Sequence, residues 1–408
     1  ASRPNGKPKP LVDVDGVPLL KRQIDTLISN GVDDIVLLVN HAADQIETFI
    51  AEQKFACPVT LIDDGDPRGT AGAALACLDR LADRFLVIYG DTLFDVDVAH
   101  MIAAQERMGA DATLLLHPND HPADSDLVEL SPEGWAIAFH SYPHPADKYL
   151  RNLVNAAFYV IEKKSLLSWV GRMEIGDFAK DLFPAMIGEG AKLLGYSSFE
   201  YIKDIGTPKR LDKAEGHLRR GVVERARRRY PQKAVFLDRD GTLNVQTDYV
   251  RTPDELVVYP DAGQAVRRLN EAEYRVVIVT NQPVLARGEC DEAGLSQIHA
   301  KLESILGEAG GYLDALYYCP HHPHKGYPGE VAELKRDCAC RKPGTLMIEQ
   351  AAEALNLDLA QCWVVGDSTA DIAMAARAGV RSVLVRTGEG GRDGKWPGEP
   401  TFTADGIG

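Results

Sequence analysis

The fold of the C-terminal half is decided by one stretch, AVFLDRDGTLN, residues Ala234–Asn244. Its four apolar residues predict a short buried strand, and the polar residues after them predict a turn at the strand end. Asp238 and Asp240 are separated by one residue, so we expect both carboxylates to point the same way off this end, where open α/β sheets place their ligands. Gly241 lets the backbone turn beneath a phosphate. Such a carboxylate pair can hold a divalent cation while one member attacks phosphorus.

Three later segments place further polar groups beside predicted strands or turns. They supply hydroxyl and amide donors for phosphate oxygens, cations that neutralise a transferring phosphoryl group, and carboxylates that complete a metal site of oxygen ligands. In that order they are Thr280 and Asn281 of VIVTNQ, Arg341 and Lys342 of CRKPG, and Asp367 and Asp371 of WVVGDSTADI. Any one of these segments is typical of a surface turn. Their order along the chain and their placement at strand ends indicate a phosphatase site.

A loop rich in cysteine and histidine precedes Lys342. It contains Cys319 and His321 in the spacing Cys-x-His and, after a long excursion, Cys338 and Cys340 in the spacing Cys-x-Cys. Three thiolates and one imidazole suit a closed tetrahedral zinc site, which would hold a loop too long to order itself. We therefore predict a structural zinc ion.

The four segments with polar groups resemble the four motifs of the haloacid dehalogenase superfamily, over about residues 233 to 387. The resemblance implies that Asp238 is the nucleophile and Asp240 the general acid and base. It implies that Asp367 joins Asp238 and the backbone of Asp240 around Mg²⁺. It also implies that the phosphoryl group is bound by Thr280, Asn281 and Lys342. The interval between the first two motifs has room for a loop and one helix, so we expect no cap domain.

Within this superfamily, two groups of capless phosphatases have a similar loop. LARG at Leu285–Gly288, the pair Tyr317–Tyr318 and VLVRTG at Val383–Gly388 resemble D-glycero-D-manno-heptose 1,7-bisphosphate 7-phosphatases more than histidinol-phosphate phosphatases. For a bisphosphate substrate, we expect either Arg287 or Arg341 to meet the second phosphate. A histidinol-phosphate phosphatase stays the alternative.

The N-terminal half resembles sugar-1-phosphate nucleotidyltransferases over about residues 7 to 211. The resemblance is carried by KPKPLVDVDGVPLLKRQIDTL, DPRGTAGAA, FLVIYGDTLFDVD and YIKDIGTPKRL. It implies that Lys9 binds phosphate and that Asp91 and Asp204 hold the Mg²⁺ that bridges the nucleotide and the sugar phosphate. It also implies that the glycines of residues 69–72 let the backbone approach the base and ribose.

The nucleotide and the activity of this half rest on the same resemblance. FLVIYGDTLFDVDV resembles heptose 1-phosphate guanylyltransferases, which implies GTP, with mannose 1-phosphate guanylyltransferase as a close alternative. The family has a glycine-rich GGxGTR loop before its PKP segment, and we expect residues preceding Ala1 to carry it. The other class of hypothesis is a non-catalytic module that binds sugar phosphates or forms dimers. Joined to the phosphatase, a working transferase would perform the next step toward a nucleotide-activated heptose.

Alternation of apolar runs with amphipathic segments predicts the architecture. It indicates three-layer αβα sandwiches with largely parallel sheets. The two resemblances imply two such domains, a Rossmann-like nucleotidyltransferase sheet followed by a capless haloacid dehalogenase sheet. We predict a first domain at 1–221, a linker at 222–232, a phosphatase domain at 233–390 and a poorly ordered tail at 391–408. The predicted strands are Asp34–Val39, Val59–Ile62, Phe85–Tyr89, Ala112–Leu116, Ala157–Ile161, Ala234–Leu237, Val276–Thr280, Trp363–Val365 and Ser382–Val385.

The composition limits the class of partner. The formal net charge of −15 over 408 residues argues against nucleic-acid binding, which needs basic surface. No apolar run approaches the ~20 residues of a membrane span, so we expect a cytoplasmic protein without membrane contact. Sugar phosphates and a nucleoside triphosphate are the expected ligands, Mg²⁺ and Zn²⁺ the expected cofactors, and a homo-oligomer is left open.

Overall fold

The chain forms two compact units. The computed structural model describes residues 7–40, 42–63, 65, 67–145 and 148–408. The first unit contains Ala1–His117, Val128–Ser141 and Asn155–Arg227, and the second contains Pro118–Leu127, Tyr142–Val154 and Arg228–Gly408. The last passage of the chain from the first unit to the second comes after Arg227, inside the predicted linker. The predicted domain boundaries themselves stay a prediction.

A mixed sheet forms the centre of the first unit. Its strands run in the order β11-β7-β10-β8-β9, with β5 paired to β10. β11 is parallel to β7, whereas β10 is antiparallel to both β5 and β8, so this sheet is less parallel than the alternating pattern predicts. The strands are β5 Arg84–Ile88, β7 Ala112–His117, β8 Leu127–Leu130, β9 Ala136–His140, β10 Val154–Glu162 and β11 Leu193–Ser197.

Three two-stranded sheets and seven α-helices complete the described part of the first unit. The small sheets pair β1 Asp13–Val14 with β2 Val17–Pro18, β3 Ile35–Val39 with β4 Val59–Asp63, and β6 Thr92–Asp95 with β12 Tyr201–Asp204. The helices are α1 Leu19–Ser29, α2 Ala43–Glu52, α3 Gly69–Ala76, α4 Val98–Met108, α5 Phe183–Gly188, α6 Pro208–Arg219 and α7 Val222–Arg225. Apolar residues of α4, β7 and β10 share one core, which contains Met101, Leu115 and Phe158.

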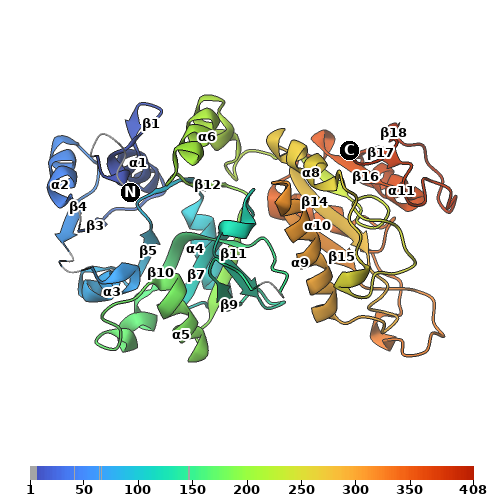
Figure 1. Ribbon diagram of the computed structural model, residues 1–408, viewed down its shortest axis with the longest axis horizontal. Helices are drawn as coiled ribbons and strands as arrows, with labels where there is room; N and C mark the ends of the chain where they lie inside the picture. The colour runs from blue at the N-terminus through green and yellow to red at the C-terminus, as the bar shows by residue number, and fades with distance from the viewer. Residues whose placement is uncertain (1–6, 41, 64, 66, 146–147) are drawn as a thin grey trace. The chain divides into compact units, whose positions relative to one another are not determined.

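A parallel six-stranded sheet forms the centre of the second unit (Figure 1). Its order is β15-β14-β13-β16-β17-β18, and every neighbouring pair is parallel. The strands are β13 Ala234–Leu237, β14 Arg275–Asn281, β15 Ala315–Cys319, β16 Trp363–Gly366, β17 Arg381–Val385 and β18 Phe402–Ala404.

Four helices cover this sheet. They are α8 Ala262–Glu271, α9 Glu292–Glu308, α10 Leu346–Leu355 and α11 Thr369–Ala378. Alternate residues of β13 and β14, such as Leu237 and Ile278, share a core with Val266 of α8 and Ile298 of α9. α10 packs against β14 and β15, and α11 packs against β16 and β17. Only α8 and a short 3₁₀ turn lie between β13 and β14, as expected for a phosphatase without a cap.

The predicted tail at 391–408 is wrong. Its glycine and proline content indicates poor order, but Phe402–Ala404 forms β18 and pairs with Val383–Val385 of β17. The Phe402 ring lies 5.8 Å from the Trp363 ring, so an aromatic contact adds to the strand pairing. Three strand residues are too few for a periodic signal, and this is why composition misleads here.

Two segments from the first half of the sequence, Pro118–Leu127 and Tyr142–Val154, belong to the second unit. In one of them, Arg151 Nε lies 2.5 Å from Glu303 Oε1, and the Asn152 backbone N–H donates to Glu303 Oε2 at 2.7 Å. Glu303 lies on α9, and its side chain is 5% exposed.

Across the described ranges, no helix is long and apolar enough to cross a membrane.

Candidate functional site

The parallel register of the second sheet brings the predicted motifs to one edge. β13 lies between β14 and β16, with Leu237 opposite Ile278 on one side and Val365 on the other. The carboxyl ends of the three strands therefore meet, and ligands of open α/β sheets bind at such an edge. Asp238, Thr280, Asn281 and Asp367 all lie there.

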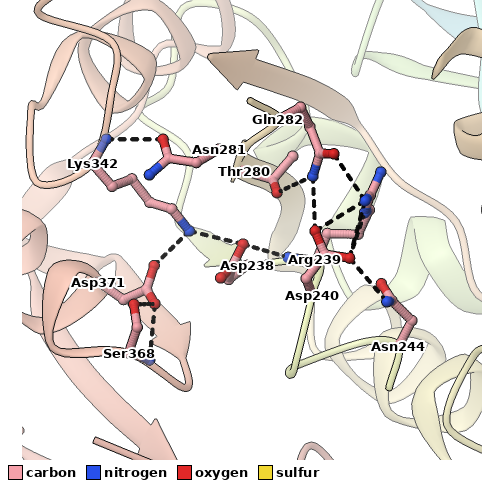
Figure 2. Close-up of polar contacts among 10 residues, drawn as sticks. All are labelled: Asp238, Arg239, Asp240, Asn244, Thr280, Asn281, Gln282, Lys342, Ser368 and Asp371. Carbon is pink, nitrogen blue, oxygen red and sulfur yellow. Dashed lines mark hydrogen bonds and ion pairs between the residues drawn. The ribbon is translucent and has the colours of Figure 1, made fainter. Parts of the chain in front are cut away.

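Three buried carboxylates gather at this edge. Oxygen atoms of Asp238, Asp367 and Asp371 lie within 4.8 Å of one another. Lys342 is the cation among them, with its Nζ 2.8 Å from Asp238 Oδ1 and 2.6 Å from Asp371 Oδ1 (Figure 2). Asp371 also accepts a hydrogen bond from the Ser368 hydroxyl at 2.6 Å. Asp371 is therefore engaged by Lys342 and Ser368, which makes it better placed to orient the lysine than to bind an ion.

The charges of this cluster do not balance within the protein. Burial raises the pKa of Asp238 to about 8, and Asp371 and Asp367 add to the rise while Lys342 opposes it. Burial likewise raises the pKa of Asp367 to about 7. Burial alone would lower the pKa of Lys342, but Asp238 and Asp371 hold it well above its ordinary value. Three carboxylates facing one lysine fit a divalent cation, because an ion with oxygen ligands would keep the acids ionised.

The two aspartates of the DRD stretch have different partners. Asp238 faces Lys342, whereas the Asp240 carboxylate faces Arg239, Asn244 and Gln282 (Figure 2). Burial alone would raise the pKa of Asp240, but the Arg239 charge and these hydrogen bonds hold it below its ordinary value. The expectation that both carboxylates point the same way is therefore wrong. Only the backbone of Asp240 stays a candidate for the ion, as the resemblance implies.

Arg239 is a residue of the site that was not predicted from the sequence. Its side chain has no exposed surface, and Nη2 lies 2.9 Å from both Asp240 Oδ2 and Gln282 Oε1. Nη1 lies 3.2 Å from His299 Nε2 on α9. Burial and the Arg239 charge lower the pKa of His299 well below its ordinary value, so the neutral imidazole accepts from the guanidinium. A charged residue between two aspartates at the end of a buried strand was the available signal.

The predicted phosphate donors lie at the end of β14. Thr280 is buried, and its hydroxyl oxygen accepts a hydrogen bond from Gln282 Nε2 at 2.9 Å. Asn281 Oδ1 accepts a hydrogen bond from the Lys342 backbone N–H at 3.0 Å (Figure 2). Asn281 therefore fixes the segment that carries Lys342.

The two predicted phosphate-binding arginines already have partners. Arg287 Nε lies 2.6 Å from Glu289 Oε1, and its guanidinium lies 4.6 Å from the Tyr249 ring and 4.2 Å from the Tyr327 ring. Arg341 donates to the His321 carbonyl oxygen at 3.1 Å. Arg341 thus links the cysteine-rich loop to Lys342, its neighbour in the chain. Binding of a second phosphate by either arginine stays a prediction.

The four predicted zinc ligands lie together. The three pairs of Sγ atoms from Cys319, Cys338 and Cys340 are separated by 3.2 to 3.5 Å. His321 Nδ1 lies 3.3 Å from Cys340 Sγ and 3.8 Å from Cys319 Sγ. Zinc bonds of about 2.0–2.3 Å in a tetrahedron separate neighbouring ligands by roughly 3.5–3.8 Å, which this cluster nearly matches. The donor set and its spacing fit a zinc ion.

The predicted transferase residues meet in the first unit. β6 and β12 are antiparallel, with Asp204 opposite Thr92, and the Ile205 backbone N–H donates to the Asp91 carbonyl oxygen at 3.0 Å. Lys9 Nζ lies 3.1 Å from Asp91 Oδ2, and Asp204 Oδ2 lies 2.7 Å from Arg210 Nη1. The strand pairing therefore brings two carboxylates and a lysine from distant parts of the sequence to one place.

A cavity of about 880 Å³ borders this site. Its lining includes Lys9, Gly69, Thr70 and Asp91 together with apolar residues of β3 and β5. The glycines of α3 have another role besides the expected approach to a ligand. A Cβ atom on Gly69 would lie 2.5 Å from the Gly176 carbonyl oxygen, and one on Gly72 would lie 2.5 Å from that of Glu174. The packing of α3 on residues 174–176 therefore requires both glycines.

Comparison with known proteins assigns each half separately. A family model described as nucleotidyl transferase matches residues 5–220, and one described as HAD-hydrolase-like matches residues 339–408. The D-glycero-beta-D-manno-heptose-1,7-bisphosphate 7-phosphatase of Bordetella bronchiseptica is 43% identical over 159 residues, which are 39% of this chain and 83% of that protein.

Solved structures match both halves as well. The chain is similar to a crystal structure of D,D-heptose 1,7-bisphosphate phosphatase from B. bronchiseptica complexed with magnesium and phosphate, at 38% identity and a TM-score of 0.38. That match covers 43% of this chain and 93% of the other. It is also similar to HddC from Yersinia pseudotuberculosis, at 24% identity and a TM-score of 0.47, over 53% of this chain and 92% of the other.

Proposed function

Because the chain belongs to the nucleotidyl transferase family and, through its C-terminal part, to the heptose-1,7-bisphosphate 7-phosphatases, we propose that it is a bifunctional enzyme. The second unit removes the 7-phosphate of D-glycero-D-manno-heptose 1,7-bisphosphate. The first unit then transfers GMP from GTP to the heptose 1-phosphate that is released. The two reactions are successive steps toward a nucleotide-activated heptose.

The cluster of Asp238, Asp367 and Asp371 around Lys342 is the observation that carries the phosphatase proposal. Asp238 Oδ1 accepts from Lys342 and from the Arg239 backbone N–H at 2.7 Å. Among the described residues, these two contacts are both made by Asp238 Oδ1, which leaves Oδ2 as the proposed attacking oxygen. A carboxylate oxygen of Asp238 attacks phosphorus, the bond from phosphorus to the sugar oxygen breaks, and Asp240 gives the leaving alkoxide a proton.

Hydrolysis of the aspartyl-phosphate completes this reaction. Water attacks phosphorus and gives its proton to the Asp240 carboxylate, and the bond from phosphorus to Asp238 breaks to release inorganic phosphate. The Arg239 charge and the hydrogen bonds on Asp240 favour its ionised form, which is the form that accepts this proton. The proton that Asp240 gives to the leaving alkoxide in the first step therefore comes from the smaller population in which Asp240 is protonated. Lys342 stabilises the charge on the transferring phosphoryl group, and Asn281 and Asp371 orient Lys342.

Two metal ions belong to the proposal. Mg²⁺, held by Asp238 and Asp367 with the backbone of Asp240, would neutralise the phosphoryl oxygens during transfer. Zn²⁺, held by the Cys319, His321, Cys338 and Cys340 cluster, would fix the loop that leads into Arg341 and Lys342. The unbalanced carboxylates support the first ion, and the near-tetrahedral spacing of sulfur and nitrogen supports the second.

In the first unit, Lys9, Asp91 and Asp204 form the proposed transferase site. An oxygen of the sugar 1-phosphate attacks the α-phosphorus of GTP, and pyrophosphate leaves. Asp91 and Asp204 would hold the Mg²⁺ that this reaction needs, and Lys9 would contact phosphate. The cavity beside these residues gives the nucleotide a place to bind.

Product analysis tests both halves at once. The full-length protein is supplied with heptose 1,7-bisphosphate and Mg²⁺, first with GTP and then with ATP, and the products are identified by mass spectrometry. We expect inorganic phosphate, pyrophosphate and GDP-heptose. Accumulation of heptose 1-phosphate in both the GTP and the ATP reaction would replace the transferase by a non-catalytic sugar-phosphate module. A kcat/KM on histidinol phosphate equal to or above that on the heptose would overturn the phosphatase substrate.

A further inference from the structure

We infer that the segment Thr387–Trp396, here called the clasp, positions the candidate magnesium ligand Asp367, and that Asp393 anchors the clasp. This inference rests on the proposed phosphatase function, because that function gives Asp367 its ion. The clasp follows β17 and precedes β18, and its second half lies in the predicted tail at 391–408. Its role is that of a positioning element, since it acts through Asp367.

The clasp makes direct contact with Asp367. The Glu389 backbone N–H donates to Asp367 Oδ2 at 2.7 Å, and the Gly391 backbone N–H donates to the Asp367 carbonyl oxygen at 2.8 Å. Asp367 is 2% exposed, so these donors replace water around it. The clasp therefore fixes the position of Oδ2 and, with it, the direction of the Asp367 carboxylate.

Gly388 makes this contact sterically possible. Its φ of +55° lies in the left-handed region, which favours glycine. A Cβ atom at this position would lie 2.0 Å from Asp367 Oδ2 and 2.7 Å from Gly241 Cα. The clasp backbone therefore packs directly on the carboxylate and on the turn that follows Asp240.

Asp393 ties the far end of the clasp to the start of α11. Its Oδ1 accepts from the Thr369 backbone N–H at 2.9 Å, and its Oδ2 accepts from the Thr369 hydroxyl. The Trp396 backbone N–H donates to the same hydroxyl oxygen at 3.2 Å, and the Arg377 guanidinium lies 5.3 Å from the Trp396 ring. Thr369 is two residues after Asp367, so the anchor and the held carboxylate share one turn of chain.

The near end of the clasp is fixed to the other metal-binding loop. The Thr387 hydroxyl donates to the Gly241 carbonyl oxygen at 2.6 Å. Gly241 follows Asp240 directly, so the clasp joins the loop after β13 to the loop after β16. Pairing of β17 with β18 then holds both ends of the segment on the sheet.

The contacts of the clasp fix the orientation of the Asp367 carboxylate. A group that hydrogen-bonds a metal ligand fixes the direction of that ligand, and loss of such a partner weakens metal binding by about 10–100-fold. Removal of the Asp393 carboxylate frees the far end of the clasp and weakens the hold of Glu389 on Asp367. We therefore expect weaker binding of a divalent cation, with less effect on turnover once the ion is bound.

Equilibrium binding of Mn²⁺, followed by electron paramagnetic resonance of the free ion, tests this inference without substrate. The full-length, zinc-loaded protein carries Asp91→Asn throughout, so that the proposed site of the first unit does not contribute. We expect Asp393→Ala to raise the Kd for Mn²⁺ by about 10-fold, the lower end of that range, because Asp393 acts on Asp367 through Glu389. The matched control is Asp405→Asn, whose carboxylate is 92% exposed and bonds to Arg386, and it should bind as the parent does.

Turnover and a second variant complete the test. At saturating Mg²⁺, the kcat for phosphate release by Asp393→Ala should return to within a few-fold of the parent. Thr369→Val removes the hydroxyl that bridges Asp393 and Trp396, and it should also raise the Kd, so the inference stays testable if Asp393→Ala fails to fold. An unchanged Kd for Mn²⁺ in a folded variant, or no Mn²⁺ binding by the parent, would refute the inference that the clasp positions Asp367. Absence of phosphate release by a parent that binds Mn²⁺ would reject the proposed function alone.

Discussion

Replacement of Arg239 by methionine tests how the Asp240 carboxylate is held. Methionine keeps an unbranched side chain of related length but removes the charge and every donor. In the wild type, Arg239 Nη2 contacts both oxygens of Asp240, and Nε contacts Oδ1 at 3.2 Å. The change also removes the donor that faces His299 Nε2 and the one that faces Gln282 Oε1.

The magnitude follows from the burial of the two partners. Breaking a buried ion pair by removing one member costs about 3–5 kcal/mol, because the other charge is left without compensation. Arg239 has no exposed side-chain surface, but 24% of the Asp240 side chain is exposed and can reach water. We therefore expect the lower end of that range, about 3 kcal/mol in the free energy of unfolding. For a unit of this size, that corresponds to a fall in Tm of roughly 6–12 °C.

Urea unfolding of the full chain provides the assay. The matched control is Arg267→Met, since Arg267 forms a 2.8 Å ion pair with Glu271 in which both side chains are more than half exposed. We expect the control to cost less than about 0.5 kcal/mol. The variant Asp240→Asn lacks the negative charge that Arg239 compensates. In that background, Arg239→Met should therefore lower the free energy of unfolding by about 2 kcal/mol less than it does in the wild type. Equal costs in the two backgrounds would refute the reasoning.

Three further predictions address the other sites. Asp238→Asn should reduce phosphate release by several orders of magnitude while GMP transfer to supplied heptose 1-phosphate survives, and Asp91→Asn should do the reverse; coupled phosphate and pyrophosphate assays decide this. Elemental analysis should find about one zinc ion per chain and a loss of that ion in Cys338→Ser, with a higher KM for the bisphosphate. Folding lowers the pKa of His299 well below its ordinary value of 6.5. Below about pH 6.5, His299 therefore binds a proton in the unfolded chain but stays neutral in the folded chain. Stability should therefore fall by about 1.4 kcal/mol per pH unit below that value, and urea unfolding of His299→Gln should lack this part of the loss.

Much of the second unit could be predicted because its sheet is parallel and buried. The predicted strands Ala234–Leu237, Val276–Thr280 and Ser382–Val385 all overlap observed strands, since each is a continuous apolar run. Once these strands are parallel, the polar residues after them must meet at one edge. The grouping of Asp238, Thr280 and Asp367 follows from that register without knowledge of any side-chain contact.

Other features depend on contacts that apolar patterns do not encode. β15, Ala315–Cys319, was not predicted, because its residues are only partly buried apart from Cys319 and merge into the cysteine-rich loop. The clasp has a composition typical of disorder, yet backbone N–H groups of Glu389 and Gly391 bind Asp367. Backbone donors leave no signature in a sequence, so a glycine-rich segment that binds a carboxylate and one that stays disordered look alike.

In the DRD stretch, the spacing of the two aspartates does not predict the directions of their side chains. Two aspartates separated by one residue were expected to share an ion, which would hold if the strand continued through both. β13 ends at Leu237, and the turn after it sends Asp238 toward Lys342 and Asp240 toward Arg239. The proposed nucleophile Asp238 and the proposed proton carrier Asp240 need different surroundings, because the first must face a cation and phosphorus while the second must exchange a proton. The intervening arginine supplies this difference, since it neutralises Asp240 locally and leaves Asp238 to Lys342 and the proposed ion.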